Sequence, residues 1–380
     1  MFDIAIIGAG ASGLMLASQL KSNNICLIDS NEKVGAKIKV SGGAKCNITN
    51  KKVTANNYLG DNAFVSSVLK EFSNDDLISF LKKQNLDFKL NEKIVKGTYF
   101  CNTSQDVIDM FSKLIKNKRL FLNTEVSDIE FDNFYKIKTN NQTIEAKKVV
   151  IASGGLSYQS LGASSIAFDV AKKFKHKVNP LNPSLVGFTV QKEQFWFKNL
   201  SGISMFVKAH VENKFFEGNI LFAHKGITGP VILNSSLYWK KGKMSIDFLP
   251  NKTFKSFLKG NKNISSSFNL PKRFMQEFLV SIELEDKPVS KLSNEELKKL
   301  EILKNYEFAP AGNFGYTKAE VTKGGVEVDE VDVKTMQSRL QKDLYFVGEA
   351  LDVTGELGGF NFQFAFSSAY VCAKELNRCV

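Results

Sequence analysis

Residues 2–29, FDIAIIGAGASGLMLASQLKSNNICLID, decide the fold of this chain. Residues 2–7 form an apolar run that ends at a glycine, residues 11–22 have helical composition, and residues 25–29 indicate a second buried strand. Gly8, Gly10 and Gly13 occupy the strand-to-helix turn in G-x-G-x-x-G spacing. In such a turn the first glycine permits the tight bend, the second lets a pyrophosphate approach the backbone, and the third lets helix and strand pack closely. The stretch therefore predicts a Rossmann-type β-α-β unit.

The second strand ends at Asp29, where a carboxylate can accept hydrogen bonds from ribose hydroxyls. The N-terminus of the intervening helix supplies N–H groups and partial positive charge for phosphates. Strand, glycines, helix, strand and acid in this order predict a dinucleotide cofactor. Residues 2–20 resemble a signal peptide in apolarity, but their one charge is Asp3, where a signal needs Lys or Arg. We expect no signal and no membrane span.

The composition is that of a globular protein, with 380 residues, 43% hydrophobic and 24% charged, and predicts more than one folded unit. The net charge of +12 has two interpretations: attraction to nucleic acid or another polyanion, or a coding bias that also enriches Asn, Phe and Ile. Five cysteines without a C-x-x-C pair and three histidines outside ligand spacing indicate neither a disulfide framework nor a metal centre. A reducing cytoplasm is the expected location.

Hydrophobic periodicity divides the rest of the chain into alternating segments. Helices are predicted near 62–72 and 75–85, the second capped by Ser73, and a meander of strands fills 120–152. Residues 187–250 have strand character, 252–305 helical character, and residues after 320 return to strands before a final helix at 361–377. Residues 187–310 hold 19 basic and 12 acidic side chains, a net charge of +7. This pattern predicts one nucleotide domain, residues 1–186 and 325–380, carrying an insertion at 187–324.

Three further glycine-rich segments favour FAD over NAD. They are SGGAKCNITN (41–50), VVIASGG (149–155) and LYFVGEALDVTGELGGFNFQ (344–363). A tightly bound flavin needs its ring held as well as its pyrophosphate, and these loops bring backbone within reach of a ligand. Asn361 and Gln363 fall in the first turn of the last helix, where N–H groups can face the flavin pyrimidine edge. A second G-x-G-x-x-G is absent from the sequence, so we expect no separate NAD(P)H domain.

The sequence resembles a family of bacterial FAD proteins described as aminoacetone oxidase-like, bile-acid enone reductase-like or ribosomal RNA dihydrouridine synthase-like. The resemblance rests on IIGAGASGL (6–14), GAKIKVSGGAKCNITN (35–50), ASGGLSYQSLG (152–162), LFAHKGITGP (221–230), AEVTKGGV (319–326) and GEALDVTGELGGFNFQFAFSSA (348–369). It implies an α/β fold: a three-layer Rossmann-type FAD domain with a β-meander, carrying an inserted β-barrel (187–250 and 306–324) and a small helical bundle (252–305). This sequence departs from the family at Gln159 and Cys101, where Pro is usual, and at 165–167, where Gly-Asp-Gly is usual.

The residues expected to contact a tightly bound FAD come from the glycine motif, the second strand and the three further loops, with Lys37 and Val126 from two other segments. They are Gly8, Gly10, Ala11, Ser12, Gly13, Asp29, Lys37, Ser41, Gly42, Asn47, Val126, Ser153, Gly154, Gly348, Glu349, Gly358, Gly359, Phe360, Asn361 and Gln363. Lys37 and Lys45 are cations that can neutralise the pyrophosphate or the reduced flavin.

Cys46 is the candidate general acid. Reducing a conjugated C=C bond needs a hydride from the flavin and a proton on the adjacent carbon, and a thiol in a glycine-rich loop can supply that proton. The alternative is a small buried cysteine that only packs. His224 is a weaker candidate for binding substrate or polarising a carbonyl, against a loop histidine whose hydrogen bonds are satisfied. Trp196 and Trp239 are expected in the core rather than on a stacking surface.

Three functions remain open from the sequence. The first is reduction of uridine to dihydrouridine in ribosomal RNA, with NAD(P)H as a transient reductant, which the resemblance and the basic insertion favour. The second is a small-molecule flavin oxidase or enone reductase, for which the charge reflects coding bias. The third is a non-catalytic FAD-containing interaction protein.

Overall fold

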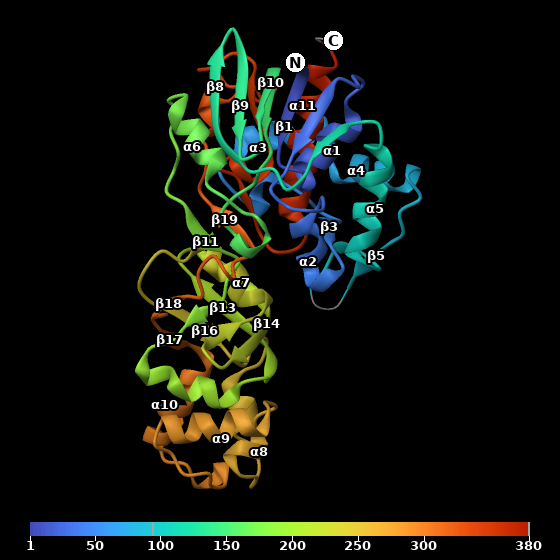
Figure 1. The fold of residues 1–380 in the computed structure, drawn as a ribbon. Helices are drawn as coiled ribbons and strands as arrows, with labels where there is room; N and C mark the ends of the chain where they lie inside the picture. Colours follow the sequence, from blue (N-terminus) through green and yellow to red (C-terminus); the bar gives the residue numbers. More distant parts are fainter. Residues whose placement is uncertain (93–94, 379–380) are drawn as a thin grey trace. The chain divides into compact units, whose positions relative to one another are not determined.

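The computed structural model describes residues 1–92 and 95–378, so Cys379 lies outside the described residues. The chain divides into two compact units, one formed by residues 1–183 and 320–380 and the other by residues 184–319. We call them unit 1 and unit 2 and describe each by itself (Figure 1). Within the described ranges, no helix is both long and apolar enough to cross a membrane.

Unit 1 is built on a seven-stranded sheet in the order β7-β2-β1-β10-β9-β8, with β20 also paired to β10. Its strands are β1 (Phe2–Ile7), β2 (Ile25–Ile28), β7 (Arg119–Phe121), β8 (Val126–Asp132), β9 (Phe134–Thr139), β10 (Thr143–Ile151) and β20 (Leu344–Phe346). The strands β7, β2, β1, β10 and β20 are parallel, whereas β8, β9 and β10 form the predicted antiparallel meander. This is the Rossmann-type α/β architecture that the segment 2–29 predicted.

The last part of the predicted meander, which ends at residue 152, is the strand β10. One continuous strand is found because its two ends have different partners. Residues 143–146 pair with β9, and residues 149–151 pair with β20 while β1 runs along the strand from Ala146 to Ile151. The meander and the parallel core are thus joined within a single strand.

Helices cover the sheet and smaller strands complete unit 1 (Figure 1). The helices are α1 (Ala11–Gln19), α2 (Ala36–Ala44), α3 (Asn62–Glu71), α4 (Asn74–Lys83), α5 (Ser104–Leu114), α6 (Ile166–Lys173) and α11 (Phe360–Leu376). The smaller strands are β3 (Asn47–Asn50), β4 (Tyr58–Leu59), β5 (Phe88–Asn91), β6 (Thr98–Cys101), β11 (Asn182–Ser184), β19 (Val321–Lys323) and β21 (Thr354–Gly355). The predicted cap of α4 is present, because the Ser73 hydroxyl accepts from Asp76 N at 3.2 Å. The helix α5 was not predicted, although Thr103 and Asp106 form the same capping box there.

Unit 2 contains a second seven-stranded sheet, in the order β17-β16-β13-β14-β15-β12-β18. Its strands are β12 (Phe188–Thr189), β13 (Ser204–Val211), β14 (Lys214–Ala223), β15 (Gly226–Thr228), β16 (Met244–Asp247), β17 (Tyr306–Phe308) and β18 (Gly312–Asn313). The helix α7 (Pro230–Tyr238) interrupts the predicted strand region and packs on β13 and β14. Between β16 and β17 lie α8 (Ile264–Ser267), α9 (Lys272–Ser281) and α10 (Asn294–Glu301). Trp196 is buried in the core of this unit, and the half-buried Trp239 packs against that core.

Candidate functional site

The glycine turn between β1 and α1 has the close packing that its spacing predicts. Gly8 has φ +103°, and a Cβ there would lie 2.6 Å from the carbonyl oxygen of Ala152 at the end of β10. A Cβ on Gly13 would lie 1.9 Å from the Gly8 carbonyl oxygen. At Gly10 the opposite holds, since φ is −83° and a Cβ would meet nothing within 4 Å. The first and third glycines thus serve packing, while the second faces open space at the N-terminus of α1.

Asp29 is fixed by the same turn. Its Oδ2 accepts from Ala9 N at 2.7 Å, and its Oδ1 accepts from Asn31 N and Asn31 Nδ2, both at 2.8 Å. A carboxylate has about four acceptor positions, so this one retains capacity for a ribose hydroxyl. Thr124 N donates to the Asp29 carbonyl at 2.9 Å, which brings the start of β8 at Val126 to the same edge of the sheet.

The C-terminal segment lies against the N-terminal glycine turn, although the two belong to opposite ends of the sequence. A Cβ on Gly348 would lie 2.0 Å from Ser12 Oγ, and Gly348 N donates to Ser368 Oγ at 3.0 Å. Asn361 closes its own loop, because its Nδ2 donates to the Gly355 carbonyl at 2.8 Å and its Oδ1 accepts from Gly355 N at 2.9 Å. Ser12 and Gly348 are therefore in direct contact, and Asn361 holds the loop that follows them in the C-terminal segment.

The N-terminus of α11 is anchored on β3. Gly359 has φ +90°, and a Cβ there would lie 2.6 Å from the Thr49 carbonyl oxygen. The fully buried Gln363 accepts from Thr49 Oγ1 at 2.5 Å and donates to Ser367 Oγ at 2.9 Å. Its side chain thus positions α11 and has its hydrogen bonds inside the protein. Gly358 and Phe360 are held in the same way, since their carbonyl groups accept from Asn50 Nδ2 at 3.1 Å and Tyr58 OH at 3.0 Å.

A charged group, which we call the Lys37 cluster, joins four segments of unit 1. It consists of Lys37, Glu320, Thr322 and Glu349. The Lys37 Nζ lies 2.7 Å from Glu349 Oε2, and the other oxygen of Glu349 accepts from Thr322 N at 2.8 Å. The Thr322 hydroxyl in turn accepts from Leu156 N at 2.8 Å in the loop that follows β10. Lys37 and Glu349, predicted separately as cofactor contacts, are thus an ion pair.

Glu320 is the titratable group of this cluster that sequence reasoning missed. Burial raises the pKa of its carboxyl to about 7, and the nearby charge of Lys37 acts in the opposite direction. Burial, followed by the charge of Glu320, raises the pKa of the Tyr158 phenol. Glu320 lies within AEVTKGGV, a segment that served only as a family marker. The sequence did contain a signal for this residue, namely an acid next to a predicted strand and a pair of glycines. Only the fold, however, brings Glu320 close to Lys37.

Cys46 is enclosed by a turn with unusual backbone conformation. Gly42, Gly43 and Ala44 have φ of +56°, +64° and +65°, and Cys46 itself has φ +52°. The Cys46 side chain has no exposed surface, and burial raises the pKa of its thiol to about 12. A thiol with such a pKa is a weak proton donor at neutral pH. These features favour the packing alternative for Cys46.

The other predicted residues of this loop shape the turn. Ser41 Oγ donates to the Ile38 carbonyl at 2.7 Å, and a Cβ on Gly42 would lie 3.0 Å from Asn47 Cγ. Lys45 is exposed, with its Nζ 5.7 Å from the centroid of the Phe100 ring. His224 is exposed between β14 and β15 and belongs to unit 2, whereas the other predicted site residues belong to unit 1.

The arrangement in unit 1 fits a dinucleotide such as FAD in three respects. Gly10 leaves space at a helix N-terminus, whose first N–H groups have no intrahelical acceptors. Ser153, which precedes Gly154 (φ +76°), has a buried hydroxyl without a hydrogen-bond partner, and such a group calls for a ligand or water. Asp29 has free acceptor capacity at the strand end where a ribose binds in this fold.

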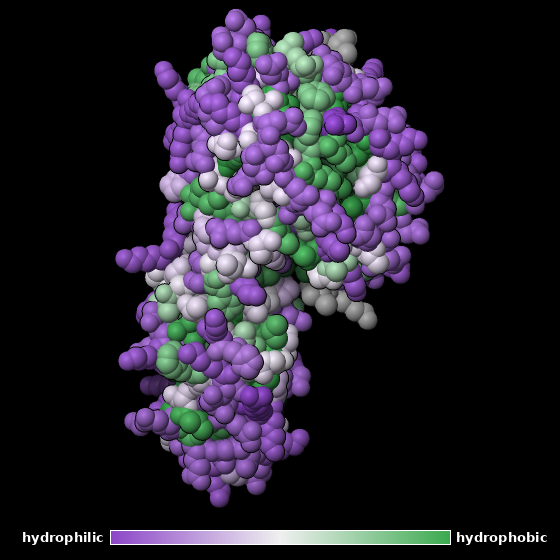
Figure 2. Space-filling model, in the orientation of Figure 1, coloured by the Kyte–Doolittle hydropathy of each residue, from purple (hydrophilic) through white to green (hydrophobic). Residues whose placement is uncertain are grey.

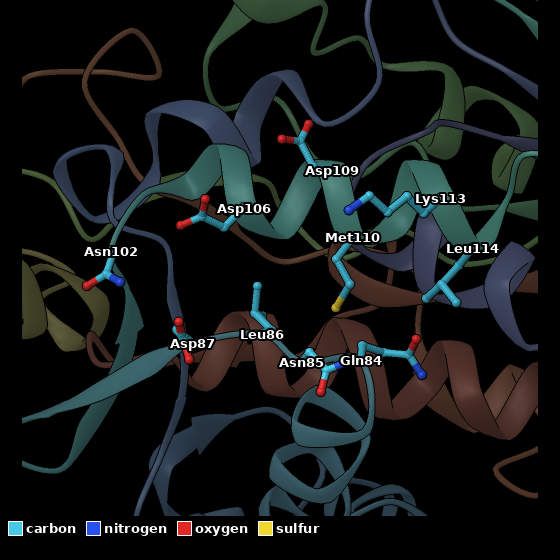
Figure 3. Close-up of a pocket in the computed structure, with 10 residues that line it drawn as sticks. All are labelled: Gln84, Asn85, Leu86, Asp87, Asn102, Asp106, Asp109, Met110, Lys113 and Leu114. Carbon is cyan, nitrogen blue, oxygen red and sulfur yellow. The ribbon is translucent and has the colours of Figure 1, made fainter.

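A separate surface pocket of about 370 Å³ lies between the C-terminal end of α4, the start of β5 and the helix α5 (Figure 3). Asp87, Asp106 and Asp109 line it together with Lys113. None of the predicted site residues lines it, and its acidic character does not suit a phosphate-bearing cofactor. Two of its acids also have structural partners, since Asp106 caps α5 and Asp109 accepts from Gln105.

The chain is similar to known proteins over nearly its whole length. A family model described as "HI0933-like protein Rossmann domain" matches residues 2–375. The chain belongs to this family. It is 36% identical to a ribosomal RNA dihydrouridine synthase of Haemophilus influenzae, over 98% of both chains. A 3-dehydro-bile acid delta(4,6)-reductase of Clostridium scindens is 27% identical, again over 98% of both chains.

A solved structure, the Sdh1 complex of Mycobacterium smegmatis in the apo form, shares the fold, with a TM-score of 0.53. The sequences are 13% identical, and the match covers 99% of this chain and 68% of that one. The predicted family, the Rossmann-type fold and the class of FAD-dependent oxidoreductase are thereby confirmed. The residues that contact FAD, the substrate and the electron donor stay predictions.

Proposed function

We propose that this protein reduces uridine to dihydrouridine in ribosomal RNA, using FAD bound in unit 1. The observation that carries this proposal is the 36% identity, over nearly the whole of both chains, to a relative named for that reaction. The basic balance of the chain, +12, supports a polyanionic substrate. Both named relatives suggest one chemistry, the reduction of a C=C bond, which is the reaction class that the family resemblance implied.

The residues of unit 1 divide the work of holding the cofactor. Bound FAD would supply a hydride from N5 of its ring. The N-terminus of α1, opened by Gly10, would bind the pyrophosphate, and Asp29 would accept a hydrogen bond from the adenosine ribose. Ser153 would donate a hydrogen bond to the cofactor from its unpartnered hydroxyl, and the Lys37–Glu349 pair would orient the flavin half. Lys37 would also offset negative charge that forms on reduction.

Glu320 is the residue to which we assign delivery of the proton. A carboxyl with a pKa near 7 is about half protonated at neutral pH, which suits a general acid that must also regain its proton. Its carboxyl lies near Lys37, itself assigned to the flavin, and this neighbour supports a role at the ring rather than on a remote surface. The enclosed thiol of Cys46, with a pKa near 12, is the weaker candidate for the same task.

NAD(P)H is the proposed source of electrons, acting as a transient reductant at the flavin itself. The chain has a single G-x-G-x-x-G segment, and we assign that segment to FAD. Anaerobic mixing of the FAD-loaded protein with NADH or NADPH should bleach the flavin absorbance, and the faster nucleotide identifies the donor.

The second candidate function is reduction of a small-molecule enone. The relative named as a bile acid reductase favours it, because it too aligns over nearly its whole length. This reaction would use the same flavin site and the same proton donor. It differs from the first candidate in the substrate, which is a small molecule in place of RNA.

The deciding experiment is nucleoside mass spectrometry of ribosomal RNA from a strain that lacks the gene. We expect loss of dihydrouridine at one or more ribosomal positions, restored by the wild-type gene and not by a Gly10→Val variant that cannot bind FAD. Unchanged dihydrouridine at every ribosomal position would reject the RNA substrate. Turnover of an enone by the purified protein would then support the second candidate.

A further inference from the structure

One face of the sheet in unit 2 carries exposed aromatic and cationic side chains. We call it the hairpin face and define it by Phe206, Lys208 and His210 of β13 and by Phe215 and Glu217 of β14. Alternate residues of a strand point to the same side, and the register pairs His210 with Phe215 and Lys208 with Glu217. The opposite side of the hairpin is buried under α7. Figure 2 shows hydrophobic residues reaching the surface among hydrophilic ones in the part of the chain that carries β13 and β14.

The aromatic rings of this face are unusually accessible for phenylalanine. Phe215 is 61% exposed and Phe206 is 49% exposed. The Phe215 ring stacks on the His210 imidazole at a centroid distance of 4.3 Å and an interplanar angle of 11°. One side of the Phe215 ring is therefore supported by His210. Phe206 and His210 lie four positions apart on β13, so the two phenylalanines stand about 13 Å apart along the sheet.

One of these rings has a cation beside it, since the Lys208 Nζ lies 5.1 Å from the centroid of Phe215. Lys214 pairs with Val211 and therefore belongs to the opposite side of the hairpin, where its Nζ lies 5.0 Å from the centroid of Tyr238 in α7. The exposed Lys240 and Lys241 follow Tyr238 in the chain.

Most of the neighbouring acids are already neutralised. Three of them have lysine partners, in the pairs Lys208–Glu217 and Lys243–Glu307, both at 3.5 Å, and Lys304–Asp247 at 2.6 Å. Beyond these pairs, Glu212 and Lys214 flank the hairpin turn, and Lys240 and Lys241 follow the end of α7. Unit 2 as a whole holds 20 basic and 12 acidic residues, a net charge of +8 out of the chain's +12.

We propose that the hairpin face is a stacking platform for unpaired bases of RNA. Every base has a π-face that can stack on an exposed aromatic ring, and the net charge of +8 on unit 2 attracts the phosphates. A base paired within a duplex keeps its faces in the helical stack, so the face should prefer single strands and loops. The rigid sheet fixes the rings in advance, which lowers the entropic cost of binding. This inference rests on the proposed RNA substrate and assigns unit 2 a part in holding it.

The test measures binding of a fluorescein-labelled, mixed-sequence, 12-nucleotide single-stranded RNA to the full-length, FAD-loaded protein by fluorescence anisotropy. Phe215→Ala should weaken binding about 5- to 150-fold, the range that loss of one stacked base produces. Phe215→Trp should retain it. Phe195→Ala is the matched control, because Phe195 is 45% exposed and has Lys198 Nζ 3.4 Å from its ring centroid, but lies outside the hairpin face. Circular dichroism checks that each variant is folded.

Equal RNA affinity of wild type and Phe215→Ala would overturn the platform. So would a self-association of the protein, measured by sedimentation, that Phe215→Ala abolishes, because the face would then be an interface between copies. Dihydrouridine formation is scored separately, so the two proposals fail independently. Normal dihydrouridine with unaffected RNA binding rejects the platform alone, whereas Phe215-dependent RNA binding without dihydrouridine rejects the reaction alone.

Discussion

The contrast between Gly10 and Gly13 gives the sharpest prediction about the cofactor. A valine at position 10 meets open space in the protein and a permitted φ of −83°, so Gly10→Val should fold. Its expected folding cost is that of a poorer helix N-cap, about 1 kcal/mol. The added side chain occupies the space in which the pyrophosphate is proposed to bind, so FAD affinity should be lost. Gly13→Ala should behave differently, because its Cβ would lie 1.9 Å from the Gly8 carbonyl oxygen. That overlap should destabilise the fold itself by about 3 kcal/mol or more.

The two effects separate in thermal unfolding with and without added FAD. At an FAD concentration about 1,000 times its Kd, the ligand stabilises wild type by about 4 kcal/mol, which corresponds to a rise in Tm of about 10 °C. Gly10→Val should match wild type without FAD to within a few degrees and show no rise on adding it. Gly312→Val is a suitable control, since Gly312 lies in unit 2 and a Cβ there makes only an ordinary contact of 3.5 Å. A yellow Gly10→Val protein with stoichiometric FAD would refute the reasoning.

Further predictions concern the Lys37 cluster and Cys46. The raised pKa of Glu320 means that the folded protein binds more protons than the unfolded chain between about pH 4.5 and 7, so stability falls as pH rises through this window, by up to about 3 kcal/mol. Glu320→Gln should therefore be more stable than wild type at pH 8 but not at pH 4, measured by urea unfolding of the FAD-free protein, and equal pH profiles would contradict the assigned pKa. As proton donor, Glu320 should also accelerate dihydrouridine formation by a factor of about 10²–10⁴. The activity of wild type should therefore decline above pH 7. The Glu320→Gln variant should be inactive but still yellow, because it keeps FAD. Cys46→Ala should keep FAD and most activity; a loss as large as that of Glu320→Gln, with FAD retained, would restore the thiol as the acid. Lys37→Met should leave Glu349 without its cation and lower the reduction potential of bound FAD, which a redox titration measures.

The parts of this protein that its sequence predicts correctly are local ones. Hydrophobic periodicity, glycine spacing and chain order predict the strand that ends before Gly8, the helix from Ala11 and the acid at Asp29. All three signals lie within one short segment of the sequence. The cap at Ser73 is equally local, because a capping box is formed by residues three apart. Family, fold and cofactor class depend on such segments, and for that reason they could be read from the sequence.

The tertiary structure decided which of the predicted side chains have polar atoms available for a cofactor or substrate. Gln363 and Cys46 both stand in glycine-rich motifs, yet both are fully buried, and distant residues such as Thr49 take up the hydrogen bonds of Gln363. Glu320 gained importance for the same reason: the fold buries its carboxyl, which raises the pKa, and brings it near Lys37, which is far away in the sequence. Burial and long-range charge depend on how the chain packs, and no local pattern encodes them. The hairpin face likewise required the strand register, which places Phe215 opposite His210 and stacks the two rings on the exposed side of the sheet.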